Sequence, residues 1–355
     1  MIDQTVLVTG AGGMLGNAIV PYFRTRYRRV LATDKILSEP WLQALDVRDE
    51  AALRAIFERE RPALVLHLAA ETDLEFCEQH PDVAEAVNHV AAGRVAELTQ
   101  AGGATLVYIS TAGVFDGTKP GFYTESDAAN PIMVYGRTKL DGELAVARAC
   151  QRQYTVRAGW MVGGGSRKDH KFVMLMLQQL LAGQTTLHAV DDRWGTPTYT
   201  HDFAMNLFRL LDTGAYGLYH MVCEGFGSRF DVAAEILKVC RREDVELVPV
   251  GSEFFKDRYF APRPPSEMMR NQRLGELGIN LMRPWQAALR DYLSREFPQA
   301  LRDGLAGGWD GADRRRDADG IGRGRRISSL GYGGPERRSG LDRRQLQALS
   351  LGLRA

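Results

Sequence analysis

The sequence lacks the cysteine and histidine patterns that would indicate a disulfide framework or a metal site. Its 355 residues include four cysteines, none of them in a Cys-x-x-Cys pair: Cys77, Cys150, Cys223 and Cys240. Scattered single thiols suit a reducing compartment. The histidines show no spacing typical of metal ligands. We therefore expect a cytoplasmic protein without a metal centre.

Long apolar runs and an excess of charge of one sign are also absent. No apolar stretch approaches the roughly 18–20 residues that span a bilayer. The N-terminus carries Asp3 and reaches a strand-like run by Thr5, which is unlike a signal peptide. The 45 basic and 44 acidic residues give a net charge of +1. The composition therefore gives no reason to expect a transmembrane segment or nucleic-acid binding.

Short apolar runs alternate with segments of helical spacing over the first half of the chain. The expected strands are Thr5–Thr9, Arg29–Thr33, Ala63–Leu68, Thr105–Ser110 and Thr155–Ala158. The expected helices are Met14–Arg26, Glu50–Glu60, Val83–Ala101 and Val134–Cys150. Continuous apolar strands separated by helices are typical of a parallel sheet covered on both faces. The pattern predicts an α/β protein whose residues 1–158 form a doubly wound Rossmann domain.

The chain is longer than a single core usually supports, so we expect a second lobe and a tail. Residues 159–298 are assigned to a smaller substrate lobe, with a return of some elements to the Rossmann sheet left open. Residues 299–355 form a basic tail, with twelve arginines, no lysine and seven acidic residues from Leu301 onward. Its scarcity of large apolar side chains predicts a disordered appendage. A segment that docks on an acidic partner or membrane surface is the alternative.

A glycine-rich turn follows the first expected strand and opens a helix. The first glycine permits a tight turn, the second lets the backbone approach a pyrophosphate, and the third lets helix and strand pack closely. The helix N-terminus then offers free N–H groups to the phosphates. The turn predicts a dinucleotide site that includes Gly10, Gly13, Met14, Leu15 and Gly16.

The end of the second expected strand carries the residues that would select the cofactor. Asp34 lies 18 residues after the last glycine of the turn, and a carboxylate there can bind the adenine ribose hydroxyls, which favours NAD. Lys35 follows and could neutralise a 2′-phosphate, which favours NADP. The cofactor is therefore NADP or NAD. Asp46 and Val47 are candidates to flank the adenine, with a helix cap as the alternative role for Asp46.

Tyr135 and Lys139 lie four positions apart at the start of an expected helix. Residues at this spacing share one helical face, so the phenol and the ammonium can meet the same bound cofactor. A tyrosine ordinarily has a pKa of about 10, and we expect the ammonium, together with the positive nicotinamide ring of the oxidised cofactor, to bring it toward neutral pH. Tyr135 would give a proton to a carbonyl oxygen as hydride reaches the carbon, and Lys139 would hold the nicotinamide ribose.

A polar strand end precedes this pair by 24 residues. Ser110 and Thr111 would lie at the carboxyl edge of a parallel strand, where hydroxyls point into the ligand crevice. Thr111 is the candidate to bind and orient the substrate carbonyl. Ordinary turn capping is the alternative for both residues.

These residues together resemble the extended short-chain dehydrogenase/reductases, and within them the dTDP-4-dehydrorhamnose reductase group. The resemblance covers roughly Thr5 to Leu293. Its specific stretches are Thr9–Gly16, Leu68–Asp73, Ser110–Thr111, Val114–Gly117, Asn130–Pro131, Tyr135–Lys139, Arg157 with Trp160, and Asp191–Thr198. The combination is far more specific than any one of these motifs.

The resemblance implies a catalytic triad of Thr111, Tyr135 and Lys139. It also implies reduction of the C4 ketone of a nucleotide-linked 4-keto-6-deoxy sugar, for surface polysaccharide synthesis, by a homodimer. Matching cofactor contacts are Gly10, Met14, Leu15, Asp34, Asp46, Val47, Ala69, Ala70 and Thr72. The residues assigned to the sugar nucleotide are Ser110, Trp160, Arg193 and Trp194.

Two departures from the family affect the sugar end of the site. The family usually has Asp-Tyr after the catalytic threonine and Thr-Ser before the tryptophan, where this chain has Ala112-Gly113 and Ala158-Gly159. Both changes remove side-chain hydrogen bonds to substrate while leaving the hydride chemistry intact. We therefore expect a related nucleotide-linked 4-keto sugar, not necessarily the rhamnose precursor.

Three other functions share this fold. A sugar-nucleotide epimerase uses the same Tyr/Lys pair, and a regulatory subunit would bind the cofactor without turning it over. A 4,6-dehydratase is less favoured, because its chemistry uses an Asp-Glu pair after the threonine and this chain has none there. The intact catalytic trio favours the reductase over the regulatory subunit.

Overall fold

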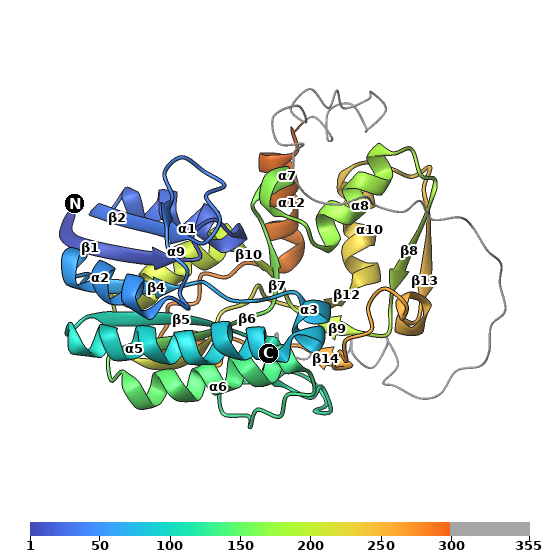
Figure 1. The fold of residues 1–355 in the computed structure, drawn as a ribbon. Helices are drawn as coiled ribbons and strands as arrows, with labels where there is room; N and C mark the ends of the chain where they lie inside the picture. Colours follow the sequence, from blue (N-terminus) through green and yellow to red (C-terminus); the bar gives the residue numbers. More distant parts are fainter. Residues whose placement is uncertain (299–355) are drawn as a thin grey trace.

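The computed structural model describes residues 1–298 (Figure 1). The tail predicted at 299–355 lies outside the described residues, so both interpretations of it stay predictions. No helix in the part of the chain that is described has the length and apolar character to cross a membrane.

A seven-stranded parallel sheet forms the centre of the larger part, in the order β11-β6-β5-β4-β1-β2-β3. The strands are β1 (Ile2–Thr9), β2 (Tyr27–Asp34), β3 (Gln43–Ala44), β4 (Leu64–His67), β5 (Thr105–Thr111), β6 (Gln153–Ala158) and β11 (Gly217–His220). The apolar run of β1 is fully buried, as a sheet covered on both faces requires. The strand order reverses beside β1, between β2 and β4. The carboxyl ends at such a switch point are where doubly wound sheets bind ligands.

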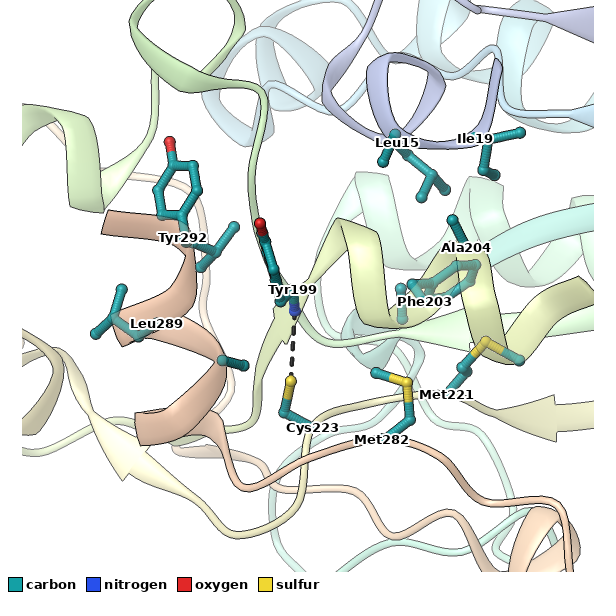
Figure 2. Close-up of a cluster of buried hydrophobic side chains, with 14 of the residues drawn as sticks. Leu15, Ile19, Tyr199, Phe203, Ala204, Met221, Cys223, Met282, Leu289 and Tyr292 are labelled. Carbon is teal, nitrogen blue, oxygen red and sulfur yellow. Dashed lines mark hydrogen bonds between the residues drawn. The ribbon is translucent and has the colours of Figure 1, made fainter. Parts of the chain in front are cut away.

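Helices cover both faces of this sheet, which confirms the predicted Rossmann class (Figure 1). One face carries α1 (Met14–Arg24) and α9 (Thr200–Leu211), and the other carries α2 (Glu50–Glu60), α5 (Ala91–Ala101) and α6 (Val134–Ala149). Figure 2 shows Leu15 and Ile19 of α1 facing Phe203 and Ala204 of α9. These apolar contacts fix the glycine turn that opens α1 against the sheet.

The helix predicted at Val83–Ala101 contains a π-helical turn. A short helix α3 (Leu74–Gln79) precedes it, and the chain is then helical without a gap through α4 (Pro81–Glu85), the π-helical turn Ala86–Val90 and α5. The turn places Asn88 so that its side chain bonds the backbone of Glu71 rather than facing solvent. The π-helical turn is a local change within a helix that the sequence predicted.

The smaller lobe lies beside the carboxyl edge of the main sheet. Its helices are α7 (Gly165–Lys168), α8 (Phe172–Leu181), α10 (Arg229–Val239), α11 (Gln272–Glu276) and α12 (Trp285–Glu296). Its strands are β7 (Trp160–Val162), β8 (Thr186–Val190), β9 (Trp194–Gly195), β10 (Pro197–Tyr199), β12 (Gly227–Ser228), β13 (Glu246–Val250) and β14 (Ser266–Glu267). Two elements of 159–298 return to the larger part: α9 packs on α1, and β11 pairs with β6.

One continuous core joins the two parts. The buried cluster that contains Leu15 also contains Tyr199, Leu289 and Tyr292. Figure 2 shows Tyr199 between α12 and α9, with its backbone N–H donating to Cys223 Sγ at 3.4 Å. The cleft between sheet and lobe is therefore held by packed side chains on both sides.

Candidate active site

A single large cleft runs from the carboxyl edge of the sheet to the smaller lobe. Its volume is about 1620 Å³, whereas sites for one small ligand typically measure ~300–1,000 Å³. The space therefore accommodates a dinucleotide and a second ligand of comparable size together. All predicted site residues but one line it: Gly10, Gly13, Met14, Leu15, Gly16, Asp34, Lys35, Asp46, Val47, Ala69, Ala70, Thr72, Ser110, Thr111, Tyr135, Lys139, Trp160 and Arg193.

Trp194 is the residue that the structure leaves out of the cleft wall. It lies in β9, and its ring packs edge-on against Phe226 with the ring centroids 5.9 Å apart. Its neighbour Arg193 does line the cleft. The alternation of side chains along a strand explains why adjacent residues take opposite sides.

The glycine turn fits a pyrophosphate. Gly10 has a φ of 66°, and a Cβ there would lie 2.4 Å from the backbone nitrogen of Ala69. A Cβ on Gly16 would lie 2.2 Å from the carbonyl oxygen of Ala11. Gly13 differs, since its Cβ would have only the Gly10 oxygen nearby, at 3.6 Å. Gly13 also begins α1 without a side-chain cap, so the first N–H groups of the helix stay available to an anion.

Replacing Gly13 with valine should therefore weaken cofactor binding without unfolding the protein. The backbone at Gly13 is extended and accepts any side chain, but the added methyl groups would occupy the phosphate approach. We expect the dissociation constant for NADH or NADPH to rise about tenfold or more. Fluorescence titration measures it, with thermal unfolding as the control. A variant with unchanged affinity would place the pyrophosphate elsewhere.

The carboxylate at the end of β2 is held by the backbone. Asp34 accepts hydrogen bonds from Gly12 N at 2.9 Å and from Ile36 N at 3.0 Å. This orientation keeps the carboxylate at the cleft, where Lys35 is also exposed. Both residues thus lie where an adenine ribose would bind, and the cofactor stays NADP or NAD.

Asp46 does not cap a helix. Asp49 is the N-cap of α2 and accepts from Ala52 N, so the alternative role proposed for Asp46 is wrong. Asp46 instead accepts hydrogen bonds from the Arg48 side chain, and this pairing lowers the pKa of its carboxyl. The Asp46 carboxylate is therefore held ionised at the cleft.

The catalytic candidates come together at the start of α6. Thr111 ends β5, and its hydroxyl acts to lower the pKa of the Tyr135 phenol, which lines the same cleft. Thr111 also accepts from Gly113 N at 3.0 Å, capping the short 3-10 turn Ala112–Val114. Thr111 can therefore cap this turn and also take part in the site, because the turn fixes the position of its hydroxyl. Lys139 follows Tyr135 by one helical turn, with an exposed fraction of 2%.

Burial shifts the pKa values of this pair in opposite directions. The pKa of Tyr135 is raised to about 12 by burial, although Thr111 opposes the shift. Burial lowers the pKa of Lys139 to about 7. The expectation that the ammonium and the oxidised nicotinamide ring together draw the phenol toward neutral pH stays a prediction. Lys139 Nζ lies 4.1 Å from the centroid of the Tyr108 ring.

A residue that sequence reasoning missed supports this arrangement. The Asn88 side chain exchanges hydrogen bonds with the Glu71 backbone and donates to Thr138 Oγ1 at 3.1 Å. The backbone carbonyl oxygen of Asn88 accepts a hydrogen bond from the Tyr108 hydroxyl. The Tyr108 ring in turn lies against the Lys139 ammonium. Asn88 thereby ties the strand end after β4 to α6. The sequence carried no signal for it, since the π-helical turn appears only in the folded chain.

His67, at the end of β4, is buried. Its Nδ1 lies 2.7 Å from Thr9 Oγ1, and its ring stacks on Tyr108. Burial lowers its pKa to about 3, so the imidazole is neutral. This residue does not provide an acid or base at neutral pH.

The smaller lobe supplies an aromatic ring and basic side chains. Trp160 Nε1 donates to Glu267 Oε2 at 2.7 Å, and the Arg229 guanidinium lies 3.8 Å from the centroid of the Trp160 ring. The basic side chains of this lobe that line the cleft are Lys168, His170, Lys171, Arg193, Arg229, Lys256, Arg258 and Arg263. Most were not predicted, because isolated charges far apart in sequence form no motif.

A protein-family model described as "RmlD substrate binding domain" matches residues 4–297. The chain belongs to the RmlD substrate binding domain family. A dTDP-4-dehydrorhamnose reductase from Mycolicibacterium smegmatis is 34% identical over 295 residues, which cover 82% of this chain and 85% of that protein. This membership confirms the resemblance found in the sequence.

Two further proteins are similar to this RmlD family member. The crystal structure of Bacillus anthracis dTDP-4-dehydrorhamnose reductase in complex with NADP has a TM-score of 0.76 at 29% identity, covering 83% of this chain and all (100%) of that one. The zebrafish (Danio rerio) protein named methionine adenosyltransferase 2 subunit beta is 29% identical, covering 82% of this chain and 90% of its own. One of these similar proteins is thus named a reductase, and the other is named a subunit of an enzyme.

The structure explains one departure of this RmlD family member. A Cβ on Gly159 would lie 2.1 Å from the carbonyl oxygen of Thr196, so no side chain fits there. At Gly113 a Cβ would meet the flexible end of Met133 at 2.9 Å and Thr111 Oγ1 at 3.4 Å. The Gly159 departure is therefore built into the backbone packing, whereas Gly113 is buried beside Thr111 and lies outside the cleft wall.

Proposed function

We propose that this protein catalyses NAD(P)H-dependent reduction of the C4 ketone of a nucleotide-linked 4-keto-6-deoxy sugar, a step toward surface polysaccharide precursors. The observation that carries the proposal is that Thr111, Tyr135 and Lys139 line one cleft that is large enough for cofactor and sugar nucleotide. Membership of the RmlD family and relatives named as reductases support it.

The reduced nicotinamide supplies hydride to the C4 carbon of the ketone. Tyr135 donates a proton to the ketone oxygen, and its pKa of about 12 keeps that proton on the phenol until it is needed. Thr111 orients the oxygen beside the phenol. Lys139 binds the nicotinamide ribose, and as an ammonium it stabilises the phenolate left after proton transfer.

Basic side chains of the smaller lobe would bind the diphosphate of the substrate. Lys171, Arg229 and Arg263 line the lobe side of the cleft together with Arg193. Guanidinium groups bind phosphate oxygens in a bidentate geometry, which suits a diphosphate. Trp160 would then pack against the sugar between the diphosphate and Tyr135. A 4-keto sugar held in this way presents its ketone to the proton donor.

Reductive activity should fall as the pH rises through about 7. Lys139 has its pKa lowered to about 7, so its ammonium is present below that pH and lost above it. Tyr135, with a pKa of about 12, keeps its proton throughout. We expect kcat/KM to fall about tenfold per pH unit on the basic side. The pH profile of Lys139→Arg should be lower but flat, because arginine does not titrate; a flat wild-type profile would contradict the assignment.

The direct test uses purified protein, NADH or NADPH, and a panel of dTDP-, GDP-, UDP- and CDP-linked 4-keto sugars. Stoichiometric oxidation of the reduced cofactor with one sugar would support the reductase and identify both cofactor and substrate. An epimerase would interconvert sugars while retaining its cofactor. A regulatory subunit would bind cofactor and do neither.

Three finer predictions from the sequence accompany this proposal. We place the protein in the cytoplasm, in keeping with the free cysteines at Cys77, Cys150, Cys223 and Cys240. We expect a homodimer. We also expect the basic segment 301–355 to be either an appendage without a partner or a docking segment for an acidic one. Light scattering of the full chain and of a chain ending at residue 298 tests the homodimer and whether the basic segment contributes to assembly.

A further inference from the structure

Glu267 reaches the cleft from the edge of the small sheet in the smaller lobe. It lies in β14, which pairs with β9 so that Glu267 is opposite Gly195. A Cβ on Gly195 would lie 2.3 Å from the Trp160 ring, so the indole lies directly over this glycine. The indole N–H then donates to Glu267 Oε2 at 2.7 Å. The carboxylate is thus part of a fixed structure rather than a mobile surface group.

The second carboxylate oxygen of Glu267 faces the cleft. It has no hydrogen-bond donor among residues 1–298, and Glu267 is part of the cleft wall. Tyr135 lines the same cleft, and the charge of Glu267 contributes to raising the pKa of its phenol. Glu267 therefore offers an acceptor to a sugar that occupies the cleft together with Tyr135.

The two residues that follow Thr111 give a sugar no polar side chain, because Ala112 and Gly113 are buried and lie outside the cleft wall. Sugar hydroxyls that leave water need acceptors in the protein, because each unsatisfied polar group costs free energy. Glu267 can provide one from the lobe side.

The charges around Glu267 decide which donor it would accept. Burial raises the pKa of the Glu267 carboxyl group, while the hydrogen bond from Trp160 and the charges of Arg229 and Arg263 oppose this shift. Arg229 stacks on the far side of Trp160, and none of its N–H groups has an acceptor within residues 1–298. Two neighbouring cations disfavour an ammonium group on the sugar. A neutral hydroxyl is the donor that fits this position.

We propose that Glu267 is a specificity-determining residue that accepts a hydrogen bond from a ring hydroxyl of the sugar near the C4 ketone. The inference rests on the proposed function and names a feature of its substrate. The enzyme should prefer sugars that keep their hydroxyls at C2 and C3 over the corresponding deoxy sugar. A site built to bind a substrate hydroxyl rejects the analogue without it strongly, here by about 100-fold in kcat/KM.

The variant Glu267→Gln tests whether Glu267 accepts a hydrogen bond from the sugar. The glutamine oxygen can still accept from Trp160, which leaves an NH₂ group, a donor, facing the cleft. We expect kcat/KM for the hydroxylated 4-keto sugar to fall about 100-fold, while kcat/KM for the 2-deoxy or 3-deoxy analogue hardly changes. Glu276→Gln, an exposed carboxylate outside the cleft wall, is the matched control.

The same variants are also measured without turnover. Calorimetry with the nucleotide-linked 6-deoxy sugar and its 2-deoxy and 3-deoxy counterparts should show a preference that Glu267→Gln abolishes. Equal losses on hydroxylated and deoxy sugars would mean that Glu267 only positions Trp160, and would overturn the proposal, as would a wild type without preference. If no sugar is reduced but the binding preference follows Glu267, the proposed function fails while this inference stands.

Discussion

Replacing Tyr135 with phenylalanine should lower kcat for ketone reduction about 10³-fold, within the range of ~10²–10⁴ expected for loss of a positioned acid. We propose the phenol as the proton donor, and Tyr135 and Thr111 line the same cleft. The loss corresponds to about 4 kcal/mol of transition-state stabilisation. The ring packs against a small apolar cluster of Cys77, Ala84 and Val134, and phenylalanine keeps that contact. The variant should therefore fold and bind cofactor as the wild type does.

Steady-state assays at saturating cofactor measure this loss, and fluorescence titration checks that the cofactor still binds. Tyr216→Phe removes a phenol whose oxygen accepts a hydrogen bond from Arg152 at an exposed position, and it should keep full activity. A Tyr135→Phe enzyme with more than about a tenth of wild-type kcat would assign proton donation to another group.

Removing the Glu143 carboxylate should produce the largest loss of stability. Arg157 donates to both Glu143 oxygens at 2.8 and 2.7 Å, and the two side chains are only 4% and 8% exposed. Glu143→Leu would leave a guanidinium buried beside Phe115 without its counter-charge. Breaking a buried pair in this way typically costs ~3–5 kcal/mol. Urea unfolding followed by circular dichroism measures the change.

The double variant Arg157→Met/Glu143→Leu is the informative comparison. It removes both charges and fills similar volume, so it should recover most of the stability that the single variant loses. Glu50→Gln, which breaks the exposed pair with Arg54, should leave the unfolding midpoint unchanged. A single variant as stable as the double variant would show that Arg157 finds another partner when Glu143 is removed.

The catalytic trio and the phosphate turn were predictable because their chemistry is local. The glycine spacing at Gly10, Gly13 and Gly16 encodes a turn whose steric limits the structure shows directly. Tyr135 and Lys139 share a helical face through their spacing alone. Thr111 was predictable because parallel strands end at a common edge. In each case a few neighbouring residues determine the geometry.

Other features required contacts between distant segments. Trp194 was expected in the cleft, but strand pairing turns its ring toward Phe226. Asn88, Arg229 and Glu267 were missed because each acquires its role from partners far away in the sequence. The raised pKa of Tyr135 likewise comes from burial, which depends on the packing of several segments around the ring.

The sequence by itself determined the alternation of strands and helices, the dinucleotide turn and the chemical identity of the catalytic groups, because short-range sterics and hydrophobic periodicity specify them. Only the tertiary structure decided that α9 and β11 return to the main sheet, which charges gather in the lobe side of the cleft and how burial shifts them. Those properties depend on which surfaces leave water together, and that depends on packing between segments more than a hundred residues apart, such as Trp160 and Glu267.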